Sequence, residues 1–234
     1  MKLLFDERKQ SDYMENAPIR KGITKVGITL WHEFWNLIKL NLLFLLSCIP
    51  IVTIPAGITA MSKICCAMVE NRHFYMWSDY WGTFRRDFWS ALAGGILTIG
   101  LTVLFGISIW FYAMLYATSR LFVLLAGCAV ALLLITLMTA CYYFPMLATV
   151  ELTFGQLIKN SFAMVLRCWK RTLLALFSFL LIIGGAILLF PYSTFMSVIL
   201  LFSLTSVLIC LSVYPAIEEF VMLSVEKNDN PEIN

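Results

Sequence analysis

The sequence has little charge and few of the residues on which soluble proteins depend. Only 13% of its 234 residues are Asp, Glu, Lys or Arg, and 61% are hydrophobic. Soluble domains carry about 25% charged and about 45–50% apolar residues. The formal net charge of +3 is too small to indicate a nucleic-acid-binding surface. These deficits exclude a soluble enzyme domain, a disordered regulator and a secreted disulfide scaffold, and they predict an all-α polytopic membrane protein.

Motifs for catalysis, cofactors and metal ions are also missing. The two histidines and seven cysteines do not stand at metal-ligand spacing. His32 and Glu33 begin like the zinc motif H-E-x-x-H, but Asn36 occupies the place of the second histidine. No nucleophile elbow, P-loop or dinucleotide-binding glycine motif occurs. We therefore expect a protein that is not an enzyme, with no catalytic residues, no metal and no cofactor. Most of the cysteines should act as small hydrophobic residues, and a disulfide between adjacent Cys65 and Cys66 is not expected in a reducing compartment.

Four apolar runs are long enough to cross the roughly 30 Å hydrocarbon core of a bilayer as helices. They cover residues 91–115, 121–145, 172–190 and 194–214, and none contains a charged residue. Short segments join the first run to the second and the third to the fourth, which predicts two helical hairpins. Glycine pairs at 94–95 and 184–185 are expected to allow close helix packing.

The first apolar stretch differs from these four because proline interrupts it. Residues 35–54 contain Lys39 and Pro50, and a weaker helix over 55–69 begins at Pro55. Two topologies compete for this stretch: one crossing, or a broken hairpin that enters and leaves by the same face. Either way the chain would have five to six membrane segments. In both, the irregular backbone at the break should pack against the full spans, since bare polar backbone is not tolerated in lipid.

Lysine and arginine counts separate the two topologies, because these residues concentrate on the cytoplasmic side of membrane proteins. With a single crossing, the connecting segments carry 7 Lys and Arg on one side and 9 on the other. With a hairpin, they carry 15 and 1. The hairpin is therefore favoured, and it predicts that both termini lie in the cytoplasm.

Three amphipathic segments flank the apolar runs on this predicted cytoplasmic side, at residues 20–34, 77–90 and 152–171. At 100° per residue, one helical face of the second collects five aromatic residues, Trp77, Tyr80, Trp81, Phe84 and Phe88. The third collects Ile158, Phe162, Val165, Leu166 and Trp169. Two roles fit such basic, aromatic helices: lying among anionic headgroups, or docking on a partner protein. The whole predicts one membrane domain over 20–220, between a flexible tail at 1–19 and an acidic tail at 221–234.

Polar residues near the membrane are few, and they define the candidate functional positions. Lys39, Asn41 and Lys63 lie near the broken hairpin, where discontinuous helices often line transport sites. The remaining candidates are the two prolines of the break, two basic residues of the aromatic helix and two acids after later apolar runs: Pro50, Pro55, Arg85, Arg86, Glu151 and Glu218. The acids are expected to pair with basic residues at the membrane surface.

Two stretches resemble the YesL-like family of bacterial membrane proteins, found mainly in Firmicutes. The more specific runs from Asn41 to Ile54 (NLLFLLSCIPIVTI) and is followed by Thr59-Ala60-Met61; the other is Tyr80 to Trp89 (YWGTFRRDFW). The likeness covers roughly residues 25–220. This chain has Pro55-Ala56-Gly57 where the family tends to have a Gly-Pro step, so the turn of the hairpin is expected to differ from that of the family.

The resemblance implies a role without catalysis, because the family contains a domain of unknown function and has no assigned catalytic residues. Its members are often encoded beside carbohydrate ABC importers, which implies an accessory role and permease subunits as partners in the cytoplasmic membrane. The alternative is a small transporter or channel with a path near the Pro50–Pro55 break.

Overall fold

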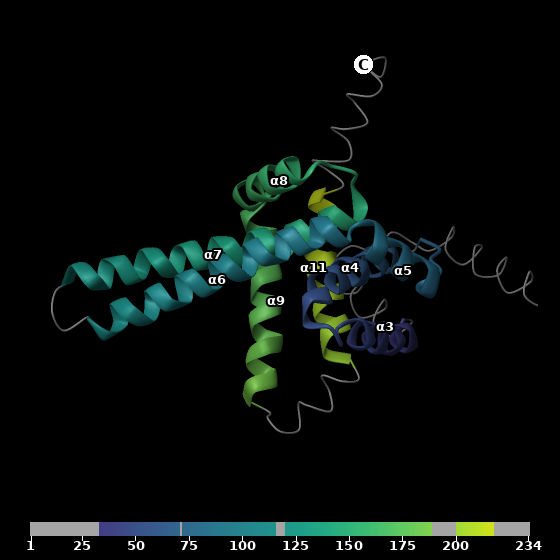
Figure 1. Cartoon of the computed structure of the whole chain (residues 1–234), viewed down its shortest axis with the longest axis horizontal. Coiled ribbons are helices and arrows are strands. Elements are labelled where there is room, and N and C mark those ends of the chain that lie inside the picture. Colours follow the sequence, from purple (N-terminus) through teal and green to yellow (C-terminus); the bar gives the residue numbers. More distant parts are fainter. Residues whose placement is uncertain (1–32, 71, 116–119, 189–199, 218–234) are drawn as a thin grey trace, which may run out of the picture.

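The computed structural model describes residues 33–70, 72–115, 120–188 and 200–217, and these ranges are helical almost throughout (Figure 1). The elements in chain order are α3 (Phe34–Ser47), the 3₁₀ turn η1 (Ile51–Thr53), α4 (Ile54–Glu70), α5 (Met76–Arg86), α6 (Phe88–Met114), α7 (Arg120–Thr149), α8 (Phe154–Arg167), α9 (Trp169–Leu188) and α11 (Phe202–Ile217). No strand occurs within these ranges, in agreement with the predicted all-α class. Both predicted tails, Glu218 and nearly all of the predicted helix at 20–34 lie outside the described residues.

The proline break separates two helices that lie side by side in opposite directions, α3 and α4 (Figure 1). Pro55 is the second residue of α4, where a missing backbone N–H costs no helical hydrogen bond. Gly57 allows close approach, because a Cβ there would lie 3.0 Å from Ser47 Oγ. The expectation that the break at Pro50–Pro55 is covered is wrong for its first part: Ile51 and Val52 are 78% and 62% exposed.

The helices α6 and α7 form a long hairpin, and α5 precedes it with a bend at Asp87. The second span was expected to end at Pro145, but α7 continues through this proline to Thr149. Pro215 likewise lies inside α11. Proline near a helix end removes one backbone hydrogen bond without preventing the next turn, so neither proline ends its helix.

The predicted amphipathic segments have different boundaries in the structure. The segment 152–171 is split at Cys168, so that Lys170 and Arg171 belong to the first turn of α9. The segment 77–90 is split at Asp87 in the same way.

The faces of these amphipathic helices also differ in part from the expected ones. Leu157, Met164 and Val165 are the buried hydrophobic side chains of α8. Val165 is confirmed on its apolar face, whereas Phe162 and Leu166, assigned to the same face, are exposed. The predicted face of α5 is closer, since Tyr80 is fully buried, although Trp77 is exposed.

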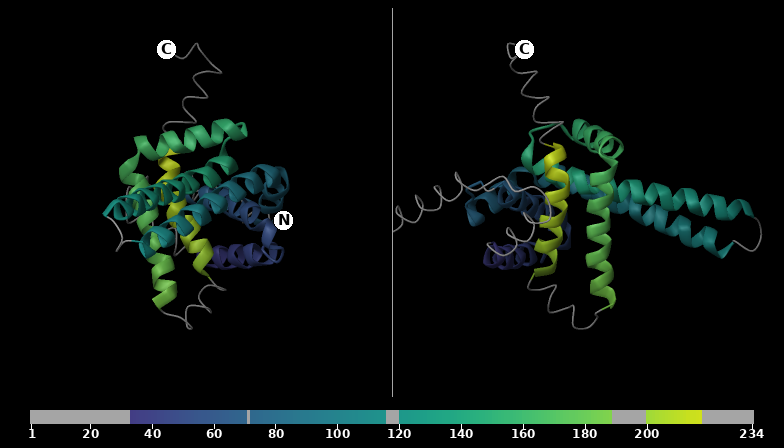
Figure 2. Two further views of the ribbon diagram at one scale, coloured as in Figure 1. Left: turned by 60° about the vertical axis from the view of Figure 1, so that its left-hand side comes forward. Right: turned by 180° about the vertical axis from the view of Figure 1, so that it is seen from behind.

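The α6–α7 hairpin runs across α9 and α11 in both figures (Figures 1 and 2). Within the described ranges, three helical stretches could cross a membrane by length and composition: Ile51–Glu70, Phe88–Met114 and Leu121–Thr149. The helices α3 and α11 are shorter apolar helices. Helices that run across one another cannot all follow the bilayer normal, so the crossed pairs must tilt differently in a membrane.

Packing divides the described residues into two regions. We call the first the junction: the helices α3, α4, α5 and α11, with the buried cluster that contains Leu40, Ile64 and Tyr80. We call the second the arm: residues 96–114 and 121–138 of α6 and α7, where Ala129 is the one buried residue among those described. Gly94 and Gly95 lie just before the arm begins and allow close packing there. A Cβ at Gly95 would lie 2.3 Å from Pro55 of the junction, and one at Gly94 would lie 2.2 Å from Tyr143 of α7. Gly184 has open space around it and does not share this packing role.

Candidate functional site: a polar cavity beside Lys63

A polar cavity of about 200 Å³ lies where the second half of α4 meets α11, the start of α5 and the end of α7. It is lined by Lys63, Ile64, Cys66, Ala67, Glu70, Arg72, His73, Phe74, Asp79, Thr149 and Tyr214. Five of these residues are ionisable as Lys, Arg, His, Asp or Glu, in a chain with few such groups. The cavity is therefore the part of the described structure best suited to a polar ligand.

Glu70 is the central acid of this cavity, and both of its carboxylate oxygens have partners. Arg72 Nε lies 2.9 Å from Glu70 Oε2, and the Tyr214 hydroxyl donates to Glu70 Oε1. The Glu70 side chain is only 15% exposed, so these charge-assisted hydrogen bonds compensate for lost hydration. They also tie the end of α4 to α11.

The opposite wall is built by the start of α5. Asp79 Oδ2 accepts the backbone N–H of Tyr75 at 2.8 Å, and its charge lies in the first turn of α5, where the helix dipole favours an acid. The ring of His73 packs edge-on against Tyr75, with ring centroids 4.8 Å apart. Glu70 and Asp79, the two acids of the cavity, are thus each held by hydrogen-bond partners.

Lys63 is half-buried in the same wall and forms no ion pair with any residue that the structure describes. An ammonium with free donors is suited to a carboxylate or phosphate group. Across the described ranges, no group of three His, Cys, Asp or Glu side chains could hold a metal ion. The chemistry that the cavity offers is binding of a small anionic group.

The structure does not bring together the three residues of the predicted transport path. Lys39 is exposed on α3, and the polar cavity includes neither Lys39 nor Asn41. Asn41 is fully buried, and its Oδ1 accepts the backbone N–H of Ser203 at 3.2 Å. Asn41 therefore fixes α3 against α11, and Lys63 alone of the three lines the cavity.

The remaining candidates have mainly structural contacts. Pro50 is exposed, while Pro55 is buried against Gly95. Arg85 is exposed and makes no ion pair with a described residue.

Arg86 is the basic candidate with acidic partners. Its guanidinium donates two hydrogen bonds of 2.9 Å to Asp87, and these raise the pKa of Arg86. Glu151, 92% exposed, lies 4.0 Å from Arg86, which agrees with the expected pairing of this acid with a basic residue.

Sequence reasoning missed Glu70, Arg72 and Tyr214. The ion pair of Glu70 with Arg72 joins the last turn of α4 to the following loop, so no helical spacing indicated it. Tyr214 meets Glu70 across 144 residues of sequence. A single acid in the last turn of an apolar segment was the only available signal.

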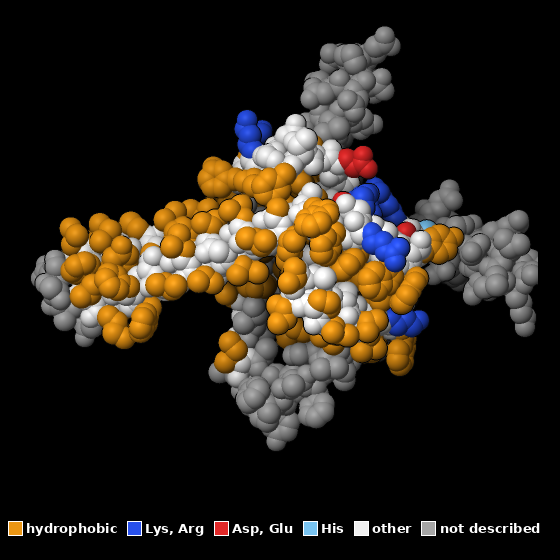
Figure 3. All heavy atoms as spheres, in the orientation of Figure 1, with side chains coloured by type: hydrophobic (Ala, Val, Ile, Leu, Met, Phe, Trp, Pro, Cys, Tyr) orange, Lys and Arg blue, Asp and Glu red, His pale blue; other side chains and the backbone are white. Residues whose placement is uncertain are grey.

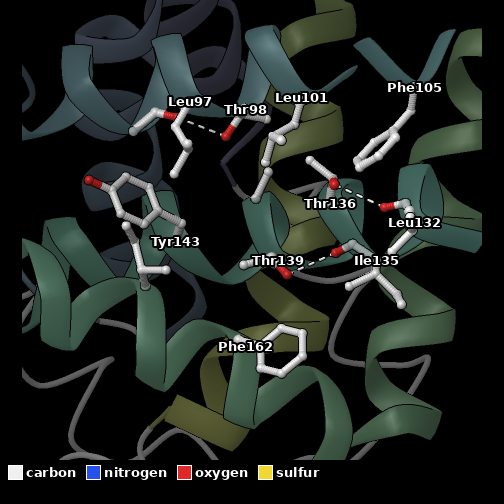
Figure 4. A pocket seen from close by; sticks show the side chains of 13 residues that line it. Leu97, Thr98, Leu101, Phe105, Leu132, Ile135, Thr136, Thr139, Tyr143 and Phe162 are labelled. Carbon is white, nitrogen blue, oxygen red and sulfur yellow. Dashed lines mark hydrogen bonds between the residues drawn. The ribbon is translucent and has the colours of Figure 1, made fainter. Parts of the chain in front are cut away.

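A second cavity, of about 310 Å³, is almost wholly apolar and lies between α6, α7 and α8 (Figure 4). Leu97, Leu101 and Phe105 come from α6, Leu132 and Ile135 from α7, and Phe162 from α8. The hydroxyls of Thr98, Thr136 and Thr139 donate to carbonyls of their own helices. The lining is therefore suited to contact with hydrocarbon, because the three threonine hydroxyls are already hydrogen-bonded within their own helices.

The two kinds of surface are also separate on the outside of the molecule. In Figure 3 hydrophobic side chains cover the arm, whereas charged side chains gather around α5 and α8. This separation is the distribution expected of a protein with one part in hydrocarbon and another at a polar interface.

Comparison with known proteins finds one family. Residues 37–109 match the family model described as "Protein of unknown function, DUF624". The match covers about a third of the chain: α3, α4, α5 and most of α6, with five ionisable residues of the polar cavity. No curated protein and no solved structure matches the chain. The chain is thus similar, over α3, α4 and α5 of the junction and part of α6, to a family whose function is not assigned.

Proposed function

We propose that this chain is a non-catalytic integral membrane protein of the bacterial cytoplasmic membrane that acts by associating with another membrane protein. The proposal rests on the exposed apolar surface of the arm. Its large apolar side chains point outward, and Ile107, Trp110 and Phe111 are 60%, 65% and 55% exposed. A two-helix hairpin encloses no path of its own, so the surface of the arm is available to lipid and to the helices of a partner.

The resemblance to the YesL-like family supports the permease subunits of a carbohydrate ABC importer as this partner. The geometry is compatible with such a role, because membrane helices associate through side-chain packing rather than through the hydrophobic effect. An exposed hairpin with large aromatic side chains near its tip offers packing of this kind.

Photocrosslinking in native membranes tests the association. A photoreactive amino acid replaces Trp110 on the arm, and in a second strain it replaces Ala91, which is fully buried. We expect adducts with importer permease subunits from position 110 and none from position 91, together with reduced oligosaccharide uptake when the protein is deleted. Adducts with lipid alone, combined with unchanged uptake in the deletion strain, would overturn the proposal.

We propose further that both termini face the cytoplasm. The charge distribution supports this orientation, because 15 Lys and Arg would lie in the cytoplasmic segments and 1 outside. The exposed Trp77, Trp89, Arg85 and Arg86 fit contact of α5 and the start of α6 with anionic headgroups on that side. Reporter fusions at Asn16 and Ser78 test the orientation, and reporters that read opposite sides would contradict it.

A small transporter is the second candidate, and the polar cavity beside Lys63 is the observation in its favour. The support is weaker, because Lys39 and Asn41 lie elsewhere. Reconstitution in proteoliposomes, with flux measured for organic anions and sugars, separates the two functions. A transporter that uses the predicted path should lose its flux when Lys39→Ala and Lys63→Ala are combined, whereas an accessory protein shows no flux with or without them.

A further inference from the structure

Small polar residues line the contact between α4 and α11. Cys66 Sγ lies 3.2 Å from Cys210 Sγ, and Cys210 Sγ lies 3.7 Å from the carbonyl oxygen of Ser62, one turn earlier on α4. One turn later, Glu70 meets Tyr214. Contacts at positions four apart on both helices mean that α4 and α11 run in the same direction along this contact. Two thiols that are 144 residues apart in sequence therefore face each other.

One of these thiols borders the polar cavity. Cys66 and Cys210 are 1% and 0% exposed on the molecular surface, but Cys66 is among the residues that line the cavity beside Lys63. The cavity of about 200 Å³ is several times the roughly 30 Å³ occupied by one water molecule. A hydroperoxide as small as hydrogen peroxide fits within it. Lys63, Arg72, Glu70 and Asp79 also line the cavity, so its charged groups are of both signs and its wall is polar.

We propose that Cys66 and Cys210 are a redox-active pair that forms a disulfide when a hydroperoxide enters the polar cavity. The Cys66 sulfur attacks the peroxide, the O–O bond breaks, and Cys66 becomes a sulfenic acid while an alcohol, or water from hydrogen peroxide, leaves. The Cys210 sulfur then attacks the Cys66 sulfur, and water leaves with the sulfenic oxygen. Two thiols and one hydroperoxide thus give a disulfide, an alcohol and water, with two electrons passing from sulfur to oxygen.

The disulfide between Cys66 and Cys210 can be reduced again in the proposed location. The end of α4 lies on the cytoplasmic side in the proposed orientation, where glutathione and thioredoxin keep thiols reduced. A thiolate from either source attacks the disulfide and restores both cysteines through a mixed disulfide. The bond would join α4 to α11 one turn from the contact of Glu70 with Tyr214, and so fix one wall of the cavity. The resting state is therefore the dithiol, and the disulfide marks exposure to peroxide.

The neighbouring Cys65 provides a matched control. It is fully buried, and it does not line the polar cavity. Adjacent residues of a helix point in directions about 100° apart, so Cys65 cannot replace Cys66 opposite Cys210. We therefore expect peroxide to oxidise Cys66 and to leave its sequence neighbour Cys65 as a thiol.

The test treats the full-length protein in detergent micelles with hydrogen peroxide and maps disulfides by peptide mass spectrometry without reduction. We expect a peptide that joins Cys66 to Cys210, the loss of two free thiols per chain and full reversal by dithiothreitol. The link should persist in Cys65→Ala and vanish in Cys66→Ala and Cys210→Ala. Thermal stability of the untreated variants shows whether each is folded.

Three results would overturn the proposal. The first is sulfinic or sulfonic acid at Cys66 with no link to Cys210. The second is a link that instead joins Cys65 to Cys66 or two separate chains. The third is wild-type protein that keeps all its thiols at peroxide concentrations that oxidise a control protein with an accessible thiol pair. Because the wild-type chain is itself mapped, the test holds even where an alanine variant fails to fold.

Discussion

The junction and the arm each contain helices that are apolar enough to cross a membrane, yet these helices are buried very differently. In the apolar stretch of α4, 61% of the residues are buried within the protein, against 11% in α6 and 6% in α7. Polar groups differ as well: Ser47 and Tyr80 of the junction bond across helices, whereas Thr102 and Ser108 of the arm donate to carbonyls of their own helix. Contacts between helices hold the junction together, while the arm depends on its own backbone hydrogen bonds and on what surrounds it.

The largest expected effect comes from the same truncation made in each region. Ile64 is fully buried in the junction and Ile107 is 60% exposed on the arm. Ile64→Ala should cost about 2 kcal/mol or more of unfolding free energy, because it leaves a cavity among packed side chains. Ile107→Ala should change it by no more than about 0.5 kcal/mol, as at other surface positions. Unfolding by SDS in mixed micelles measures both, and equal losses would show that the arm is packed as tightly as the junction.

The next effect is smaller and tests the boundary between the two regions on a single helix. A Cβ at Gly94 would lie 2.2 Å from the Tyr143 ring, whereas one at Gly106 would meet nothing within 4 Å. Gly94→Ala should therefore cost about 1–3 kcal/mol through overpacking. Gly106→Ala should stabilise α6 by up to about 1 kcal/mol, because alanine is the better helix former. The same SDS titration compares them, and a neutral Gly94→Ala would mean that α6 and α7 can separate at this point without cost.

The helices of both regions were largely predictable, because length and lack of charge define apolar helices wherever they pack. Residues 91–115 and 121–145 are close to α6 and α7, and a helix lies on each side of the proline break. The predictions failed where packing decides the outcome. Pro145 and Pro215 were read as helix ends, although each lies within the last turns of a continuing helix. Hydropathy also says nothing about how helices are oriented relative to one another, so it could not show that α6 and α7 run across α9 and α11.

Of the residues that line the polar cavity, only Lys63 was among the predicted functional positions. A lysine within an apolar segment stands out in a sequence, whereas Glu70 and Tyr214 become partners only when α4 packs on α11. The contact of Cys66 with Cys210 was missed for the same reason, since Cys210 looked like a small hydrophobic residue in an apolar run and Cys66 was considered only with its neighbour Cys65. The glycines show a similar limit: Gly94 and Gly184 are alike in sequence, and only Gly94 has a side chain packed on it.

A third prediction concerns the buried hydroxyl of Tyr80 in the junction. Ser47 donates to the carbonyl of Phe44 at 2.8 Å, so the hydrogen bond of 2.6 Å between Tyr80 and Ser47 has the tyrosine as donor. Tyr80→Phe removes this bond and should cost about 0.5–1.5 kcal/mol. Tyr75→Phe is the control, because Tyr75 is exposed and its change should be close to zero. A loss from Tyr75→Phe as large as that from Tyr80→Phe would contradict this account.

Tyr80 should also make the junction sensitive to alkali. Burial raises the pKa of Tyr80 above its usual value of about 10. The unfolded chain then releases the phenolic proton at lower pH than the folded one, so stability is intact below about pH 10 and falls as the pH rises further. The decline should be shallower in Tyr80→Phe than in wild type or Tyr75→Phe. Parallel declines in all three proteins would show that the Tyr80 phenol titrates as freely as an exposed one.

The smallest effect is expected at the ion pairs beside the bend that joins the junction to α6. Arg86 donates two hydrogen bonds to Asp87, whose side chain is 12% exposed, and it lies 4.0 Å from Glu151, whose side chain is 92% exposed. Exposed pairs contribute about 0.2–1 kcal/mol, and a partly buried, doubly hydrogen-bonded pair belongs at the upper end of that range. A double-mutant cycle of Arg86→Gln with Asp87→Asn should therefore give a coupling near 1 kcal/mol, and one with Glu151→Gln a coupling near zero, with Arg85→Gln as the unpaired control. High salt should leave the first coupling largely intact, because Asp87 is shielded from solvent where α5 ends and α6 begins. If the Glu151 pair proved the stronger, the bend at Asp87 would be held by the segment after α7 rather than by its own ion pair.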